Sequence, residues 1–265
     1  MAHLSTESAK LANGTTSVPL AVIRSARRRK DGKVYINDDK PARADYKPRG
    51  EIEIVDGVMS PLPNHQTRVW YVFAAAGAGK SSWVGNLLSE VRADKGGDVP
   101  MFLISRAAEE DEAFEGLDLQ RIVIDDDYMA DPLRYNDFPA GGCWVVIDDF
   151  DTFPKDQKAV VIELIEDLCN SGRKHGINVI VTSHLGANNS ETKAILNSMQ
   201  NVTIFPAGSS AHQIKYVLGH YCGCSNDDIR KMLKLPTRWV SVRRVYPPCV
   251  TWQGGCYMLG AAAPN

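Results

Sequence analysis

Residues 69–82 read VWYVFAAAGAGKSS, and this stretch decides the fold. Its first five residues are continuously apolar, as expected of a β-strand buried on both faces of a parallel sheet. A loop of small residues follows, and from about Lys80 the apolar residues recur at helical spacing. The loop matches the Walker A pattern GxxxxGK(S/T), except that Ala74 replaces the first glycine. A strand, a small-residue loop and a helix in this order predict a phosphate-binding loop.

The residue types of this loop suit a polyphosphate ligand. Small side chains let backbone N–H groups curl around phosphates, and the N-terminus of the following helix adds partial positive charge. Lys80 is a cation that can reach the β- and γ-phosphates, and the Ser81 hydroxyl can ligate Mg²⁺. The loop therefore predicts ATP and Mg²⁺ as cofactors. The expected nucleotide-binding residues are Ala75, Ala76, Gly77, Ala78, Gly79, Lys80, Ser81 and Ser82.

A Walker B pattern follows at residues 143–149, which read CWVVIDD. An apolar strand that ends in two acids places both carboxylates at the carboxyl edge of a parallel sheet, beside the phosphate-binding loop. We interpret Asp148 as the Mg²⁺ ligand, acting through water. Asp149 is the candidate to orient or deprotonate an attacking water. Residues 125–127, three Asp after a shorter apolar run, compete for this role, but an exposed turn is the better interpretation for them.

Polar residues also end a further expected strand, because residues 178–184 read NVIVTSH. In nucleotide hydrolases with an extra strand between the Walker A and Walker B strands, this position senses the γ-phosphate. Thr182 and His184 are therefore candidate catalytic residues. His184 could also contact DNA or a neighbouring subunit.

Several cations are candidates for contacts outside the nucleotide site. Arg173, in the loop before that strand, is the candidate arginine finger that acts on a neighbouring subunit. Arg106 and Arg134 are its rivals, and each is also explained as a surface charge. Basic residues near Trp239 and Trp252 could line a DNA channel or form a solvated face. These residues are Arg230, Lys231, Lys234, Arg238, Arg243 and Arg244.

Strands alternate with helices along most of the chain. This order predicts a three-layer α/β sandwich of the P-loop NTPase (RecA/ASCE-like) class with a mainly parallel central sheet. Turn signals between the last apolar runs predict antiparallel hairpins added at one edge. The expected strands are 51–55, 69–73, 101–104, 121–124, 143–147, 178–182, 202–205, 239–245, 249–252 and 256–259. The expected helices begin near Lys80 and span about 155–169, 191–199, 211–221 and 227–233.

The first 60 residues differ from the rest. Residues 1 to about 20 are polar and small, which predicts a disordered start. Residues 24–49 carry ten Lys or Arg against four Asp, which indicates an arm that contacts nucleic-acid phosphates; a solvated leader or a nuclear import signal are the alternatives. We therefore divide the chain into a basic arm or small subdomain over residues 1–60, partly flexible, and a P-loop ATPase domain over residues 61–265.

The composition is that of an ordinary globular protein, with 44% apolar and 23% charged residues. A net charge of −2 does not by itself point to a polyanionic partner. The six cysteines form no CxxC pair, so we expect reduced thiols in an intracellular compartment. No secretion signal is expected, and no stretch approaches the roughly 20 apolar residues of a membrane span.

With these motifs in place, the chain resembles the genome-packaging ATPases of nucleocytoplasmic large DNA viruses, a branch of the FtsK/HerA superfamily. The resemblance covers roughly residues 65–260. Two departures concern acidic and sensor positions: Asp149 stands where many relatives use Glu, and His184 where cellular members often carry an amide. The segments that carry the resemblance are 102–106 (FLISR), 146–151 (VIDDFD), 172–177 (GRKHGI), 181–184 (VTSH), 221–223 (YCG) and 238–240 (RWV).

The resemblance implies an ATPase that assembles into a homo-oligomeric ring, a hexamer or pentamer, at a capsid vertex. It implies double-stranded DNA as the substrate, threaded into a preformed capsid. The implied location is the host cytoplasm or a viral factory, with association with the virion as a further option. The alternatives left open are a small-molecule or nucleotide kinase on a P-loop scaffold and a switch or scaffold that binds ATP without cycling.

Overall fold

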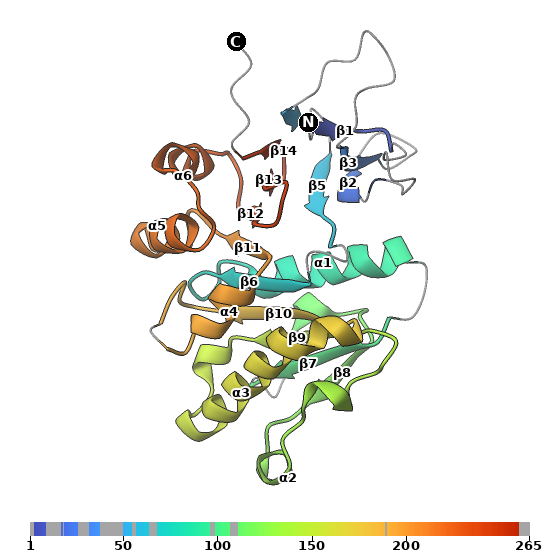
Figure 1. Cartoon of the computed structure of the whole chain (residues 1–265), viewed down its shortest axis with the longest axis vertical. Coiled ribbons are helices and arrows are strands. Elements are labelled where there is room, and N and C mark those ends of the chain that lie inside the picture. Colours follow the sequence, from blue (N-terminus) through green and yellow to red (C-terminus); the bar gives the residue numbers. More distant parts are fainter. Residues whose placement is uncertain are drawn as a thin grey trace.

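The computed structural model describes residues 3–8, 17, 19–25, 32–37, 50–54, 57–63, 68–95, 99–106, 111–188 and 190–259. Most of them belong to a ten-stranded sheet with the order β4-β14-β13-β12-β11-β6-β10-β9-β7-β8. Figure 1 shows this sheet running from β8 near the bottom to β14 near the top. A four-stranded sheet, in the order β1-β3-β2-β5, lies beside its upper end.

Six neighbouring strands of the large sheet are parallel. The middle strands are buried along their whole length, as continuous apolar runs require when helices cover both faces of a sheet. β10 lies between β6 and β9, so the strands that carry the two Walker motifs are separated by one strand. The six strands are β8 (Leu119–Ile122), β7 (Met101–Ser105), β9 (Trp144–Asp148), β10 (Asn178–Ser183), β6 (Val69–Phe73) and β11 (Asn201–Ile204).

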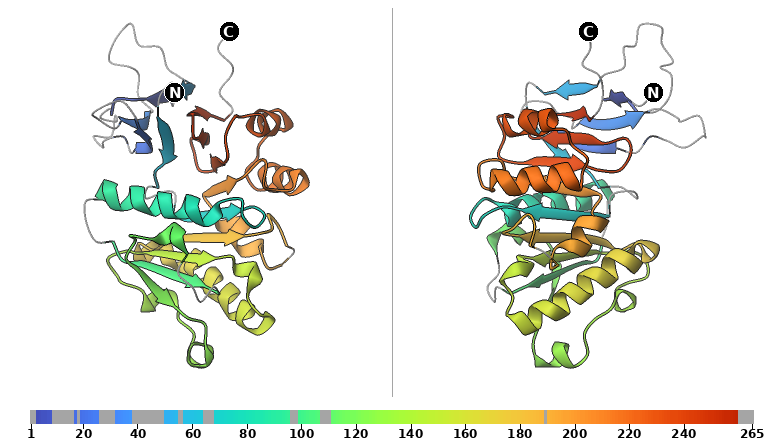
Figure 2. Two further views of the ribbon diagram at one scale, coloured as in Figure 1. Left: turned by 180° about the vertical axis from the view of Figure 1, so that it is seen from behind. Right: turned by 60° about the vertical axis from the view of Figure 1, so that its left-hand side comes forward.

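Alternate side chains of these strands pack against helices on opposite faces. Trp70 and Val72 share a core with α1, whereas Tyr71 and Phe73 share a core with the later helices. In Figure 1 α3 lies in front of the sheet, and the reversed view of Figure 2 brings α1 to the front. The predicted three-layer α/β fold is thereby confirmed. The helices are α1 (Lys80–Lys95), α3 (Lys155–Ser171), α4 (Lys193–Ser198), α5 (Ala211–His220) and α6 (Asn226–Leu233).

The C-terminal strands extend the sheet in antiparallel fashion, as predicted. β12 (Val240–Arg243) pairs with β11, and β13 (Cys249–Trp252) and β14 (Gly255–Met258) follow as hairpins. β4 (Glu51–Glu53), which comes from the N-terminal segment, pairs with β14 and forms the edge. The chain therefore closes its large sheet with strands from both ends of the sequence.

The prediction of a disordered start is wrong for the described part of the N-terminal segment. β1 (His3–Ser5), β2 (Pro19–Arg24), β3 (Gly32–Asn37) and β5 (Val58–Pro61) form the small sheet. Leu4 is fully buried and belongs to a third core, which the small sheet shares with strands β13 and β14. The boundary expected after residue 60 falls inside β5. The apolar residues that build this core are few and scattered, which is why composition suggested disorder.

Two described cations of the expected basic arm contact helix α1. Arg24 Nε donates to Glu90 Oε1 at 2.9 Å, and Lys33 forms an ion pair with Asp94. Both acids lie in the second half of α1, so the small sheet is tied to the helix that follows the phosphate-binding loop. The other cations of the arm lie outside the described residues.

Residues 125–127 are exposed, as predicted, but they begin a short helix and do not form a turn. The Asp125 side chain accepts a hydrogen bond from the Tyr128 backbone N–H at 2.9 Å and caps α2 (Asp126–Ala130). This segment follows the edge strand β8, two strands away from β9. Asp125 therefore caps a short helix, and residues 125–127 lie too far from β9 to take the role predicted for the Walker B acids.

Helix α1 requires a glycine at its contact with the segment after β7. A Cβ at Gly85 would lie 1.9 Å from the Ala113 carbonyl oxygen, so Gly85→Ala is expected to destabilise the protein by roughly 1–3 kcal/mol despite the better helix propensity of alanine. The control is Gly219→Ala in α5, where no atom lies within 4 Å of the added Cβ and stability should hold or rise. Thermal unfolding of both variants checks this. Equal unfolding temperatures for the two variants would contradict it.

Candidate functional site

The loop between β6 and α1 is held at the carboxyl edge of the sheet. Ala74 N–H donates to the Ser183 carbonyl at 3.1 Å and Ala75 N–H to the Gly208 carbonyl at 2.7 Å. Two glycines take positive φ angles, 74° at Gly77 and 102° at Gly79, which residues with a Cβ adopt at a cost. Nothing lies within 4 Å of a Cβ position at Gly77. The loop is thus anchored at its start and open at its tip, which fits a cradle for phosphates.

Lys80 lies between this loop and the Walker B acids. Its side chain is only 5% exposed, and Nζ donates to the Ala74 carbonyl at 3.1 Å. The same Nζ lies 3.2 Å from Asp149 Oδ1. The ammonium is therefore held by the Ala74 carbonyl and by Asp149, and it would have to exchange one of these contacts to bind a phosphate oxygen.

Asp148 and Asp149 are positioned by one hydroxyl. Thr182 Oγ1 donates to Asp148 Oδ1 at 2.7 Å and accepts from the Asp149 backbone N–H at 2.7 Å. Asp149 takes the left-handed conformation, with φ 45°, which Asp tolerates better than most residues. Burial raises the pKa of Asp148 to about 6, partly offset by the hydrogen bond from Thr182. The carboxyl is therefore costly to ionise here without a cation, which suits a metal ligand.

His184 is held between two acids. Its Nε2 lies 3.4 Å from Asp149 Oδ2, its Nδ1 lies 3.3 Å from Asp151 Oδ2, and its backbone N–H donates to Asp151 Oδ1 at 3.0 Å. Sequence reasoning missed Asp151, although a third acid two residues after the Walker B pair was a visible signal. Ligand atoms of Asp149, Asp151 and His184 lie within 4.8 Å of one another, so this trio is a second set that could hold a divalent cation.

The candidate arginine fingers lie in three places. Arg173 is exposed in the short helix at Gly172–His175, which precedes β10 and so lies at the edge opposite to Thr182. Arg106 follows β7 at the same edge as Asp148, and its Nη1 donates to the Thr152 carbonyl at 3.0 Å. Arg134 lies 3.7 Å from Glu163 on the surface. The structure therefore does not bring Arg173 near the phosphate-binding loop of its own chain.

The C-terminal basic residues make different kinds of contact in the fold. Trp239 and Trp252 are buried, and Arg244 donates to the Leu196 and Asn197 carbonyls. Arg238, by contrast, reaches the phosphate-binding loop. Arg230, Lys231, Lys234 and Arg238 are exposed, so a contact with DNA stays a prediction for them, whereas the two tryptophans are buried and do not present a surface to DNA. Two further cations form ion pairs, Arg230 with Asp227 and Lys231 with Glu51, and the side chain of Arg243 is buried.

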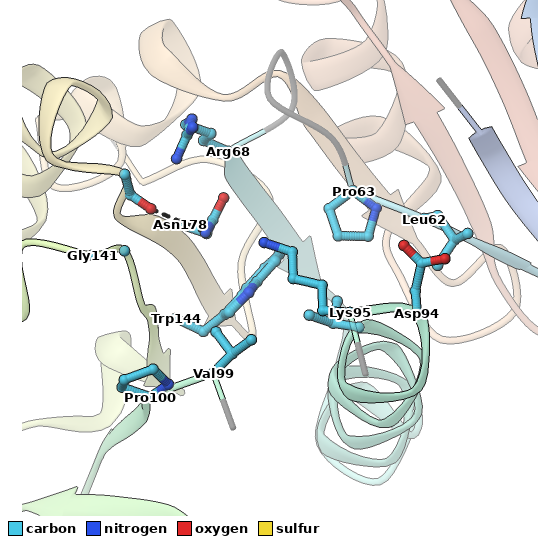
Figure 3. A pocket seen from close by; sticks show the side chains of 13 residues that line it. Leu62, Pro63, Arg68, Asp94, Lys95, Val99, Pro100, Gly141, Trp144 and Asn178 are labelled. Atoms are coloured by element: carbon cyan, nitrogen blue, oxygen red, sulfur yellow. Dashed lines mark hydrogen bonds between the residues drawn. The ribbon is translucent and has the colours of Figure 1, made fainter. Parts of the chain in front are cut away.

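A cavity of about 520 Å³ lies at the opposite edge of the sheet, where β6, β9 and β10 begin. Figure 3 shows Arg68, Lys95, Trp144 and Asn178 around it. None of the loop residues 74–82 lines this cavity. It is therefore separate from the candidate nucleotide site, whose walls are the loop and the strand ends.

Within the described residues, no helix is long and apolar enough to cross a lipid bilayer.

The burial of Asp148 predicts a pH-dependent stability. Its pKa is raised from 3.8 to about 6 in the fold, so ionisation opposes folding and stability is lost as pH rises through this window. Without Mg²⁺ and nucleotide, Asp148→Asn should raise the free energy of unfolding at pH 7.5 by about 1–3 kcal/mol. The gain should be smaller at pH 5. Urea unfolding at both pH values checks this, and a variant less stable than wild type at pH 7.5 would refute it.

The sheet order, the helices on both faces and the anchored glycine loop define a P-loop NTPase fold. Among solved structures, the chain is similar to the cytoplasmic domain of the type VII secretion ATPase EccC from Thermomonospora curvata, with 14% identity and a TM-score of 0.50 over 86% of this chain. The chain spans only 30% of that protein's chain. It is also similar to B204, the DNA-packaging ATPase of Sulfolobus turreted icosahedral virus, with 10% identity, a TM-score of 0.48 and coverage of 76% and 100% of the two chains.

A sequence relative places the chain in a family. The uncharacterized protein V3 of Sputnik virophage is 30% identical over 238 residues, which cover 87% of this chain and 91% of V3. The chain belongs to the family of this virophage protein. No protein-family profile matches the sequence.

Proposed function

We propose that the chain hydrolyses ATP to translocate double-stranded DNA, most specifically to package a viral genome into a preformed capsid. One observation carries the proposal: Lys80, Asp149 and Thr182 meet at the carboxyl edge of the sheet, beside an anchored glycine loop. This arrangement joins a phosphate-binding cation to a candidate general base. A fold alone would not define a function.

The loop residues 75–82 would hold the nucleotide phosphates through their N–H groups and the N-terminus of α1. Ser81 and Asp148 would hold Mg²⁺, which when bound neutralises charge on the phosphates. Lys80 would exchange its contact with Asp149 for one with the γ-phosphate. Asp149, released from Lys80, would orient a water and accept its proton. His184 stays next to Asp149, where it would contact the Asp149 carboxyl both before and after that carboxyl accepts the proton.

The proposed ring rests on the place of Arg173. β10 separates Arg173 from Thr182, and its six residues span about 20 Å. Arg173 therefore cannot contact the nucleotide of its own chain and would act only on a neighbouring copy, as an arginine finger does. A homo-oligomeric ring around double-stranded DNA, docked on capsid vertex proteins in the host cytoplasm or viral factory, is the assembly that we propose.

ATP hydrolysis by the purified protein, with and without double-stranded DNA, tests the proposal. We expect a weak basal rate that rises when duplex DNA is added and that is absent in Lys80→Ala. Single-stranded DNA and RNA at equal nucleotide concentration are the controls for cargo. A rate that depends on Lys80 but is indifferent to every nucleic acid would leave an ATPase and would rule out DNA as the cargo.

A further inference from the structure

Arg238 touches the phosphate-binding loop from the C-terminal part of the chain. Its Nε donates to the Ala78 carbonyl oxygen at 3.0 Å. Three atoms of the guanidinium lie 3.1 to 3.3 Å from the position that a Cβ on Gly79 would take. The side chain therefore lies directly against the last residue before Lys80, although Arg238 and Lys80 are 158 positions apart in the sequence.

The backbone of Arg238 is fixed by neighbouring contacts. Its N–H donates to Gln253 Oε1 at 3.3 Å, and Gln253 Oε1 also accepts from Thr237 Oγ1 at 3.2 Å. The next residue, Trp239, is buried against Trp83 of α1, with ring centroids 5.9 Å apart. The arginine is thus pre-positioned by a buried anchor on the same helix that begins with Lys80.

The charge of Arg238 has no acidic partner among the described residues, because its one side-chain hydrogen bond there goes to a neutral carbonyl. A guanidinium carries five N–H donors, and this bond uses one. The remaining donors lie at Gly79, next to the N–H groups where a P-loop holds phosphates. Arginine binds phosphate oxygens in a planar, bidentate manner.

We propose that Arg238 contacts the phosphate chain of the nucleotide in the same chain, so that the polyphosphate lies between Lys80 and Arg238. The proposal rests only on the nucleotide-binding part of the function proposed above, and not on hydrolysis or on DNA. It gives the segment before β12 a part in nucleotide binding, in place of a contact with DNA.

The competing explanation is that Arg238 only supports the loop through the Ala78 carbonyl. Two variants separate these roles. Arg238→Lys keeps the cation but loses the Nε hydrogen bond, whereas Arg238→Gln loses the charge. A phosphate contact predicts that lysine, which keeps the charge but not the bidentate fork, loses less affinity than glutamine. A support role predicts that both variants lose affinity to the same extent.

Isothermal titration calorimetry of the protein tests the proposal. The protein is titrated in the presence of Mg²⁺ with ATPγS, with inorganic tripolyphosphate and with adenosine. For Arg238→Gln we expect Kd for ATPγS and tripolyphosphate to rise at least about tenfold, with less than a twofold change for adenosine. Arg238→Lys should raise both Kd values by less than Arg238→Gln does, because it keeps the charge but not the bidentate fork. The control is Arg230→Gln, which replaces an exposed arginine paired with Asp227 and should leave every Kd unchanged.

Each outcome decides between the two proposals. Unchanged tripolyphosphate affinity in Arg238→Gln, or an equal loss of affinity in both Arg238 variants, overturns the role of Arg238. Either result leaves the proposed ATP-driven translocation of DNA standing. A wild-type protein that binds ATPγS through Arg238 but does not hydrolyse ATP keeps this inference and overturns the proposed function. A wild-type protein that binds neither ATPγS nor tripolyphosphate overturns both.

Discussion

Replacing Lys80 with alanine should lower the rate of ATP hydrolysis by at least about a hundredfold, the loss that follows removal of a preorganised electrostatic contact to a transferring group. Lys80 Nζ is buried between the Ala74 carbonyl and Asp149. Its loss removes the cation that we propose faces the phosphates, and it also removes the ion-pair partner of Asp149. A malachite-green phosphate assay measures the rate, and circular dichroism establishes that the variant is folded.

The matched control lies at the other end of the same helix. Lys95 is exposed in the last turn of α1, and Lys95→Ala should hydrolyse ATP at the wild-type rate. If the two variants lose activity equally, the effect comes from the helix and not from the site. If Lys80→Ala retains more than half of the wild-type rate, Lys80 does not serve the transferred phosphate.

Asp149→Asn should lower kcat by roughly 10²–10³-fold while nucleotide affinity stays within a few fold of wild type, because a general base acts on the chemical step. Asparagine is the right substitution, since Asp149 has φ 45° and Asn tolerates this conformation. The backbone N–H to Thr182 Oγ1 can therefore be kept. Steady-state kinetics together with ATPγS binding separate the two quantities.

Asp156 provides the control for this variant. It is exposed in the first turn of α3, a few residues after the Walker B strand, and Asp156→Asn should leave kcat unchanged. An Asp149→Asn protein that binds ATPγS normally and hydrolyses ATP normally would remove Asp149 from the reaction and direct attention to Asp151.

The sequence predicted the elements of the central sheet because each of them is a local feature, and it predicted the meeting of Lys80, Asp148, Asp149 and Thr182 because parallel strands end at one edge. A buried strand, a glycine loop and a helix form a continuous segment, and strands that are parallel must end at one edge. The alternation of strands and helices then limits the topology to a few arrangements. The turn signals between the last apolar runs predicted the antiparallel hairpins near the C-terminus.

The positions that sequence reasoning missed depend on long-range contacts. Arg238 was considered only as a candidate DNA contact, because it reaches Ala78 through the fold and its neighbours in sequence do not indicate that contact. Leu4 is buried although its neighbours are polar, because its partners come from strands β13 and β14. Such pairings leave no periodic signal within a single short segment.

The pairing of β4 with β14 constrains the order in which the chain can fold as it leaves the ribosome. Residues 51–53 are synthesised about two hundred residues before the strand that they pair with. The third core likewise joins Leu4 and Met59 to Cys249 and Cys256. During translation the N-terminal segments therefore lack their final packing partners until the C-terminal strands have been synthesised. The parallel strands between these two parts of the sequence can pair earlier. The N-terminal sheet is thus synthesised first, but its core is completed last, when β13 and β14 pack against it.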